Sequence, residues 1–446
     1  MHKDDPLVTS VSKSMELYNQ ASKLIPGATQ LISRRPTRYA YGITPAYASS
    51  ARGARFTDVD GNRFIDWVSG IGAVILGYCD SVVDESVKRQ IDLGTMYSVS
   101  HPIEIELAEL LIKRIPCAEM VRFAKGGGDA CAVAIRIARG TTGRNKILFS
   151  GYHGWHDWYL AANHKSGELD SHLFPGIDPI GVPVELSGTV LPFPYDDLDF
   201  LETLLEDNRE DTAAIIMEPL RSEFPSEGYL SGVRQLADKF DVLLIFDEVS
   251  TGFRPTDSGV QPLVGVTPDM AVFAKSLSNG YPMGAVVGTR KAMQPAAQMF
   301  ISSTYWSDTI GIRAAITTLE ELSIRNSVST IHNTGQILKT EISQLLQKYS
   351  LPAVCDGVDW HPYLRFHTED NIQLINTLYI QEMAKRSVHT GMSFYINESH
   401  GESELSETLG AVEAVFTILR KALDNGQLHD LVETIPQTDG FRRLVR

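Results

Sequence analysis

The sequence predicts an α/β protein whose large domain is built on a mostly parallel sheet. Short apolar runs without alternation recur between residues 121 and 290, and they are typical of strands covered on both faces. Segments with helical spacing lie between them. The chain has 446 residues, 43% of them hydrophobic, which is enough for two or three lobes. The candidate strands are 121–124, 146–149, 213–217, 242–246, 271–273 and 283–288.

Outside this region the pattern changes. Residues 10–25 have helical spacing and stop at Pro26-Gly27, and β-rich runs flank a hairpin turn at Asp60-Gly61-Asn62. Helical patterns return at 309–349 and 403–424. The segment 165–195 is rich in Gly, Pro and Ser, which predicts a long surface loop.

These patterns predict a division into domains. Residues 76–326 are expected to form the large domain, which carries the mostly parallel sheet. Residues 1–75 form an N-terminal segment that belongs to a small domain, and residues 327–446 form the C-terminal α+β part of that domain.

Charge and cysteine content exclude several classes of protein. The chain has 40 Lys+Arg against 55 Asp+Glu, a net charge of −15, which argues against nucleic-acid and membrane partners. No apolar run approaches the roughly 18 residues of a membrane helix, and the N-terminus lacks a signal pattern. The four cysteines are scattered along the chain, which indicates reduced thiols rather than a disulfide framework. A cytoplasmic protein is therefore expected.

Three glycines follow the first candidate strand. Gly126, Gly127 and Gly128 precede a helix whose apolar residues repeat at i, i+3, i+4 and i+7. Backbone N–H groups there can approach an anion closely, and the helix dipole favours a phosphate. The glycines predict a phosphate-binding loop, although an ordinary glycine-rich turn would have the same sequence.

An acid and an amine follow two other strands. Asp247 ends the run at 242–246, where a buried carboxylate needs a cation or a strong donor. Lys275 follows 271–273, where burial lowers the pKa of the amine and makes it a nucleophile or base. A structural ion pair is the alternative for each residue.

The segment GYHGWHDW at 151–158 follows a fourth strand. The spacing of His153 and His156 suggests a metal site, but no third ligand is near in the sequence, so no metal is predicted. An aromatic wall beside a flat ligand is the preferred interpretation.

A phosphate loop, an aromatic segment, an aspartate and a lysine are together the parts that hold pyridoxal 5′-phosphate (PLP). The lysine forms the Schiff base and the glycines hold the phosphate. The aspartate keeps the pyridine nitrogen protonated, so that the ring accepts electrons.

Motifs in a fixed order extend over nearly the whole chain. They are LIPGATQ (24–30), DVDGNRFIDWV (58–68), MVRFAKGGGDA (120–130), AIRIARGTTGR (134–144), GYHGWHDW (151–158), FDEVSTGFR (246–254), FAKSLSNGYPMGAVVG (273–288) and STYWSD (303–308). In this order they resemble the class III aminotransferases of PLP fold type I, in particular the glutamate-1-semialdehyde aminomutase-like branch. The resemblance implies a seven-stranded, mostly parallel sheet in the large domain and a small α+β domain.

The resemblance also implies roles around the cofactor ring. Lys275 is the Schiff-base lysine and the catalytic residue, and Asp247 is the partner of the pyridinium. Val249 packs behind the ring, and Tyr152 stacks in front of it.

The phosphate contacts are implied in the same way. Gly126, Gly127 and Gly128 form the loop that gives backbone donors. Thr304 reaches the phosphate of the neighbouring subunit's cofactor, so a homodimer with shared active sites is implied. The family's loop usually reads Asn-Ser-Gly-Thr-Glu-Ala, so two hydroxyl side chains are missing here, and each lost hydrogen bond costs about 0.5–1.5 kcal/mol.

Substrate contacts are implied at four positions. Arg34 falls where the aminomutase holds its substrate carboxylate, with Arg35 as the alternative. Ile71 and Met392 stand where the aminomutase has a tryptophan and a gating glutamate, which argues against the mutase reaction. Glu223 lies near a position that ω-aminotransferases use to switch an arginine.

The expected activity is a ping-pong transfer of an amino group from an amine donor to a keto acid, an aldehyde or a keto sugar. The alternatives are an aminomutase, an amino-acid epimerase and a PLP-binding protein without turnover.

Overall fold

The computed structural model of the protein describes residues 10–165, 167–170, 172, 176–220, 222–368 and 371–437. They form two compact units. The sheet unit runs from Ser81 to Val328. The terminal unit combines the chain up to Asp80 with the chain from Ser329 onward.

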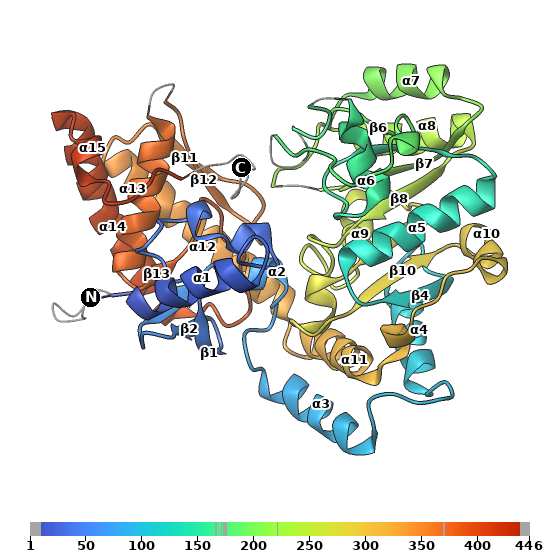
Figure 1. The fold of residues 1–446 in the computed structure, drawn as a ribbon, viewed down its shortest axis with the longest axis horizontal. Coiled ribbons are helices and arrows are strands. Elements are labelled where there is room, and N and C mark those ends of the chain that lie inside the picture. Colours follow the sequence, from blue (N-terminus) through green and yellow to red (C-terminus); the bar gives the residue numbers. More distant parts are fainter. Residues whose placement is uncertain are drawn as a thin grey trace. The chain divides into compact units, whose positions relative to one another are not determined.

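The sheet unit is built on a seven-stranded sheet (Figure 1). Its strands are β4 (Met120–Ala124), β5 (Lys146–Ser150), β6 (Val190–Pro192), β7 (Thr212–Met217), β8 (Leu243–Asp247), β9 (Met270–Phe273) and β10 (Gly284–Gly288). They lie in the order β4-β10-β9-β8-β7-β5-β6. β10 is antiparallel to β4 and β9, and the other neighbouring pairs are parallel. The predicted α/β fold with a seven-stranded, mostly parallel sheet is confirmed.

Burial explains why the apolar runs form this sheet. Every residue of β7, β8, β9 and β10 is buried, as expected for strands covered on both faces. The helix α5 (Gly127–Thr142) packs on β4, β7, β8, β9 and β10, as Figure 1 shows. The carboxyl ends of β4, β8 and β9 meet at one edge of the sheet, which is where ligands bind in open α/β sheets.

The other helices of the sheet unit precede, connect or follow these strands. They are α3 (Ser81–Leu93), α4 (Ile103–Arg114), α6 (Asp157–Leu160), α7 (Leu198–Asp207), α8 (Tyr229–Phe240), α9 (Gln261–Val264), α10 (Arg290–Met293) and α11 (Thr309–Ile324), and α12 (Ser327–Lys348) continues into the terminal unit. The prediction of a loop over 165–195 is wrong at its C-terminal end, because β6 lies there. Among the described residues this three-residue strand pairs only with β5. It ends in a proline, so the sequence has no apolar run that would indicate it.

The terminal unit combines both ends of the described chain. Its helices are α1 (Ser12–Leu24), α2 (Ser69–Gly72), α13 (Ile372–Lys385), α14 (Glu402–Asn425) and α15 (Leu428–Leu431). Its strands are β1 (Ala48–Arg52), β2 (Arg55–Asp58), β3 (Arg63–Asp66) and β13 (Val388–His389), in that order in one sheet, with β11 (Ala353–Asp356) and β12 (Tyr363–Phe366) in another. The hairpin expected around Asp60-Gly61-Asn62 is the antiparallel pair of β2 and β3.

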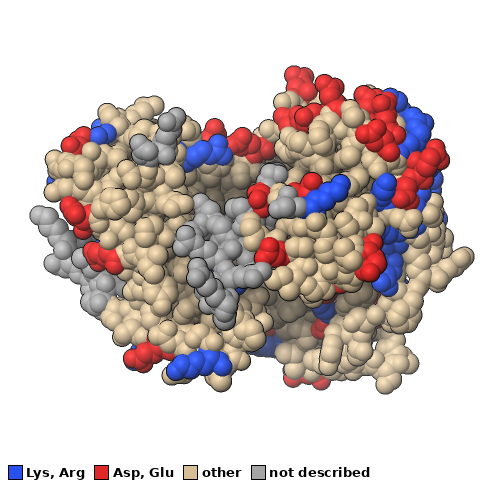
Figure 2. All heavy atoms as spheres, turned by 45° about the horizontal axis from the view of Figure 1, so that its top comes forward, with Lys and Arg blue, Asp and Glu red and all other residues tan. Residues whose placement is uncertain are grey.

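Acidic and basic side chains are interspersed over the face of the sheet unit that Figure 2 shows. Within the described residues, no helix is both long and apolar enough to span a membrane. All four cysteines are free thiols.

Glu248 directly follows β8 and is fully buried. Its carboxylate accepts hydrogen bonds from the Val260 amide (2.6 Å) and from Nε2 of Gln261 (3.2 Å). Burial nevertheless raises the pKa of Glu248 from 4.5 to about 7. Between these pH values the folded protein keeps a proton that the unfolded chain releases, so stability decreases as the pH rises.

We expect this group to lower the free energy of unfolding by up to about 3 kcal/mol between pH 4.5 and 7. Denaturant titrations at several pH values measure the slope, which should be smaller in Glu248→Gln. Equal slopes in the two proteins would contradict this account of Glu248.

Candidate functional site

Lys275 lies two residues after β9, at the edge of the sheet where the parallel strands end. It begins the 3₁₀ helix η5 (Lys275–Ser278) with φ 47°, a left-handed conformation that is uncommon for a residue with a side chain. Its Nζ donates a hydrogen bond to Oγ of Ser250 at 2.8 Å. Burial lowers the pKa of the Lys275 amine, while the carboxylates of Glu218 and Asp247 oppose this shift. The structure therefore holds a desolvated amine on a strained backbone, as functional sites often do.

Asp247 is the last residue of β8, and its Cα pairs with that of Val272 on β9. It is 4% exposed, and both carboxylate oxygens accept hydrogen bonds. Oδ2 lies 2.8 Å from Nδ1 of His153 and accepts from Sγ of Cys131 at 3.4 Å, and Oδ1 accepts from the Val249 amide at 3.0 Å. The carboxylate is thus fixed by three separate segments of the chain.

Cys131, His153 and Asp247 also bring possible metal-ligand atoms within 4.8 Å of one another. Burial and the neighbouring Asp247 raise the pKa of the Cys131 thiol well above its usual value. In this arrangement the thiol donates to Oδ2 of Asp247, which Nδ1 of His153 also contacts. The hydrogen bonds therefore account for this cluster.

The three glycines lie where β4 passes into α5. Gly126 is the N-cap of α5, without a side-chain cap, and the space beside it is open. A methyl group on Gly127 would lie 2.7 Å from Cγ1 of Val249, so the valine side chain occupies the space that a side chain at 127 would need. Glycine is required there because of this close approach.

Replacing Gly127 by alanine should therefore force Val249 or the loop to move. We expect Gly127→Ala to lower the free energy of unfolding by about 1–3 kcal/mol, the usual cost of overpacking. Thermal and denaturant unfolding measure this loss. The control is Gly391→Ala, because Gly391 also lacks a positive φ but its added methyl group would meet no atom within 4 Å, so it should lose little stability. Equal losses in both variants would contradict a role for the Val249 contact.

Tyr152 lies in the loop after β5 and is 45% exposed. Its amide donates to Oε2 of Glu218 at 3.2 Å, and its ring contacts Tyr159 edge-on at 5.9 Å between centroids. The ring is available to a flat ligand, as an aromatic side chain in such a loop would be.

The two histidines of GYHGWHDW do not act as a pair. His153 is buried and bonds Asp247, whereas Nε2 of His156 lies 3.3 Å from Oδ1 of Asp129 in α5. The two histidines contact different carboxylates, so their spacing in the sequence does not bring them to one shared site.

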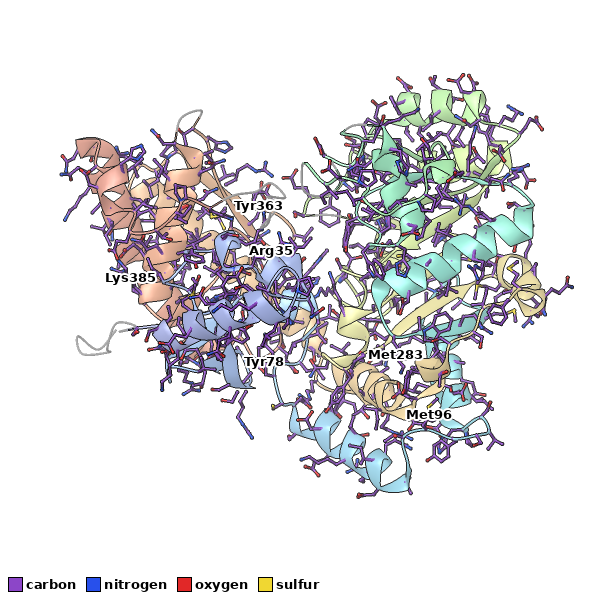
Figure 3. All side chains as sticks on the ribbon, in the orientation of Figure 1. Arg35, Tyr78, Met96, Met283, Tyr363 and Lys385 are labelled. Carbon is purple, nitrogen blue, oxygen red and sulfur yellow. The ribbon has the colours of Figure 1, made fainter. Side chains whose placement is uncertain are left out.

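Thr304 is exposed and begins the 3₁₀ helix η7 (Thr304–Ser307). The segment around it is held to the glycine loop by an ion pair between Lys125 and Asp308. Nζ of Lys125 also lies 3.9 Å from the sulfur of Met283, which Figure 3 labels. Lys125, the first residue of the altered loop sequence, thus binds a carboxylate of the protein itself.

The three predicted substrate residues lie in different places. Glu223 is exposed in the loop between β7 and α8 of the sheet unit, whereas Arg34 and Ile71 belong to the terminal unit. Ile71 has φ 61° and ψ 47° and lies between two glycines with positive φ. A β-branched residue in this conformation is strained, and such strain clusters at functional sites. Nearby in the chain, Tyr78 (Figure 3) donates to Asp66 at 2.6 Å.

Sequence reasoning missed three residues of the site. Cys131 donates a hydrogen bond to Asp247, Ser250 accepts one from Lys275, and Lys125 pairs with Asp308. The only sequence signal for Cys131 is its position four residues after Gly127, on the face of α5 that packs on the sheet.

Known proteins are similar to this chain in sequence and in fold. The model of the family "Aminotransferase class-III" matches residues 39–356. The 3-aminobutyryl-CoA aminotransferase of Cloacimonas acidaminovorans is 34% identical over 428 residues, which cover 93% of this chain and 99% of the relative. The glutamate-1-semialdehyde 2,1-aminomutase of Methanosphaera stadtmanae is 33% identical over 434 residues, 92% of this chain and all of the relative.

A transaminase solved with PLP bound has the same fold, with a TM-score of 0.83 at 25% identity over 93% of this chain and 99% of the other. The chain therefore belongs to the class-III aminotransferases, and it is a PLP-dependent enzyme.

Proposed function

We propose that the protein transfers an amino group between two separate substrates, an amine donor and a carbonyl acceptor, with Lys275 as the catalytic residue. The observation that carries this proposal is the partly buried Lys275 amine, whose pKa is lowered by desolvation and which lies beside the strand that ends in Asp247. A neutral amine at this edge can take a proton from a substrate carbon and return it at a neighbouring atom.

The residues at the sheet edge fit PLP. The open space beside Gly126 and the free amides at the start of α5 suit its phosphate, and the exposed face of Tyr152 suits its ring. Asp247 would hold the pyridine nitrogen, and Val249, whose methyl groups contact Gly127, would pack behind the ring. When bound, PLP supplies an electron sink for the pair left on the substrate carbon.

The protein groups then have separate tasks. Ser250 accepts a hydrogen bond from Lys275 and holds Nζ in place until the amine is needed. His153 and Cys131 orient the Asp247 carboxylate through hydrogen bonds to the same oxygen. Lys275 moves the proton, and positioned proton transfer of this kind contributes about 10²–10⁴ in rate.

Transfer between two substrates is favoured over isomerisation of one. The relatives named above include both an aminotransferase and an aminomutase. By the resemblance, Ile71 and Met392 stand where the aminomutase has a tryptophan and a gating glutamate. Neither side chain carries a charge, and the Ile71 backbone is strained. We propose that this part of the chain does not retain an intermediate, so a product leaves after the first half of the reaction.

Two charged residues are proposed to contact the substrate. Arg34 is exposed in the terminal unit and would bind a substrate carboxylate, for which a guanidinium is well suited. Glu223, which is exposed in the loop after β7, would contact a substrate from the sheet unit. Arg34→Ala is the variant that tests the first role, with an amine lacking a carboxylate as the comparison substrate.

We further propose a homodimer with shared active sites. Thr304 lies among exposed apolar side chains, since Phe300 is 84% and Tyr305 is 69% exposed, and such groups are typical of protein interfaces. Thr304 would contact the phosphate in the partner's site. Sedimentation velocity should give about twice the mass of one chain, and Phe300→Asp should shift the protein toward the monomer.

A panel of amino acids, diamines and amino sugars, assayed with and without carbonyl acceptors, tests the proposed function. Mass spectrometry should detect product only when both substrates are present. An isomer formed from a single amine would instead support the aminomutase or epimerase.

A further inference from the structure

We propose that His156 binds the phosphate group of PLP and takes the place of the side chain that the glycine loop lacks at position 128. This inference rests on the proposed assignment of Gly126, Gly127 and Gly128 to the phosphate. It adds a residue from the loop after β5, which the family's loop sequence does not predict.

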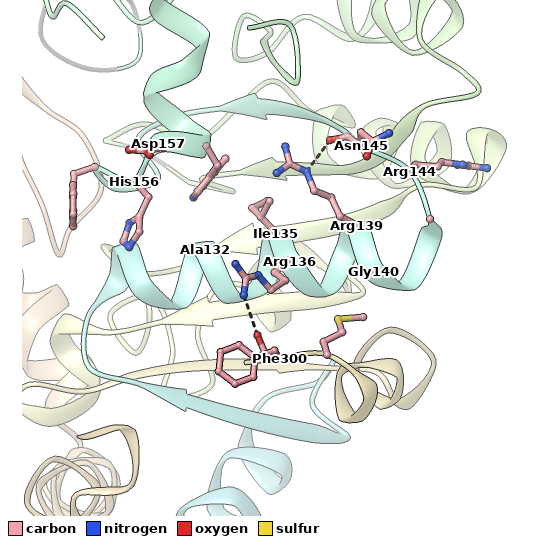
Figure 4. Close-up of a pocket in the computed structure, with 14 residues that line it drawn as sticks. Ala132, Ile135, Arg136, Arg139, Gly140, Arg144, Asn145, His156, Asp157 and Phe300 are labelled. Carbon is pink, nitrogen blue, oxygen red and sulfur yellow. Dashed lines mark hydrogen bonds between the residues drawn. The ribbon is translucent and has the colours of Figure 1, made fainter. Parts of the chain in front are cut away.

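The first observation is where the His156 ring lies. A methyl group on Gly128 would be 3.2 Å from both Cε1 and Nδ1 of His156. The imidazole therefore fills the space that a threonine would occupy at this position. Figure 4 shows the ring beside the N-terminal end of α5.

The second observation concerns the two ring nitrogens. Nε2 lies 3.3 Å from the Asp129 carboxylate, whereas Nδ1 is buried and makes no hydrogen bond to any described residue. Leaving a buried polar atom without a partner costs about 1–3 kcal/mol. An anion at the start of α5 would satisfy Nδ1, which can donate a hydrogen bond to it, while Nε2 stays beside the Asp129 carboxylate.

The third observation is the close packing that keeps the ring there. A methyl group on Gly154 would lie 2.7 Å from Cα of Gly128, so the two loops are in direct contact. Trp155 packs on His156 with 4.7 Å between ring centroids. The ring is held against the glycine loop from its own side.

Other cations near the loop are already engaged. Lys125 forms its ion pair with Asp308. The pocket of about 790 Å³ along α5, shown in Figure 4, is lined by His156 together with arginines. Of these, Arg136 donates to the carbonyl of Phe300 and Arg139 to that of Asn145. His156 thus offers an unpartnered ring nitrogen at the start of α5, where the neighbouring Lys125 already has its ion pair.

The test is equilibrium binding of PLP and of pyridoxal, which lacks the phosphate, to the apo form of the full chain. We expect His156→Ala to weaken PLP about tenfold or more, the effect of losing one charge-assisted hydrogen bond, and to leave pyridoxal unchanged. His156→Gln, which keeps an amide donor, should lose less. His164→Ala, which removes an imidazole that contacts the carbonyl of Pro183, is the matched control and should change neither affinity.

A second substitution makes the test reciprocal. Gly128→Thr should weaken PLP in the parent protein, because the new side chain collides with the His156 ring. In the His156→Ala background, the same substitution should restore most of the lost affinity by supplying a hydroxyl group.

Three results would overturn the inference. They are an equal loss for PLP and pyridoxal, no loss in His156→Ala, or no recovery in the double variant. Failure of the assigned phosphate loop is distinguishable, because the parent protein would then bind PLP no better than pyridoxal. Circular dichroism shows whether each variant is folded, and His156→Gln replaces His156→Ala if the latter is not.

Discussion

Lys275→Ala is expected to lose all measurable turnover while it keeps its fold. The side chain lies partly buried after the end of β9, and its Nζ donates a hydrogen bond to Ser250. Alanine removes the only amine proposed to move the proton, and a loss of at least 10²–10⁴ follows from that step alone. Loss of the covalent attachment adds to it. Steady-state assays with the best donor and acceptor pair measure the effect.

The attachment itself has an independent readout. After borohydride reduction, peptide mass spectrometry of the parent protein should find the cofactor on the peptide that contains Lys275, and the variant should show none. Lys239→Ala removes a surface lysine that pairs with Glu202 and serves as the control, with activity unchanged. Turnover retained by Lys275→Ala would contradict the assignment.

Asp247→Asn is expected to lower kcat by about 10²–10³, the usual cost of removing one preorganised electrostatic group from an active site. Asparagine has the same shape, so packing against β9 is preserved. Oδ2 accepts a hydrogen bond from Cys131 and contacts Nδ1 of His153. An asparagine NH₂ group in the place of Oδ2 could not accept the Cys131 hydrogen bond. The neutral amide also cannot stabilise a protonated pyridine nitrogen.

The control for Asp247→Asn is Asp257→Asn, which neutralises a half-exposed carboxylate near Arg114. We expect it to leave kcat unchanged. Binding of PLP to Asp247→Asn should be measured beside kcat, because a parallel loss of cofactor would mimic a catalytic defect. An unchanged kcat in the loaded variant would exclude the proposed role of Asp247.

Fully buried strands made the sheet predictable from the sequence. The runs that become β7, β8 and β9 are apolar throughout, and the residues after them mark one edge once the strands are parallel. β6 was hidden because three edge residues ending in proline carry no pattern. The domain boundaries at 76 and 326 stay predictions. The chain passes from one compact unit to the other near these positions, after Asp80 and after Val328.

The site was predictable only where a residue's place in the chain determines its place in the fold. Lys275 and Asp247 come at the ends of apolar runs, so the sequence alone indicates at which edge of the sheet they lie. The contacts of Cys131 and His156 depend on helix phase and on how one loop packs against another, which local sequence does not encode. The altered glycine loop predicted a weakened phosphate site, and only the position of the His156 ring points to its replacement.

The most direct test of the central claim is a half-reaction with an amine donor alone. If the protein is an aminotransferase between two substrates, a donor without acceptor should yield one equivalent of carbonyl product per subunit and then stop. Adding a carbonyl acceptor should restart the reaction and release the new amine in equal amount. Continuous formation of an isomer from the donor, without release of a carbonyl compound, would contradict the account.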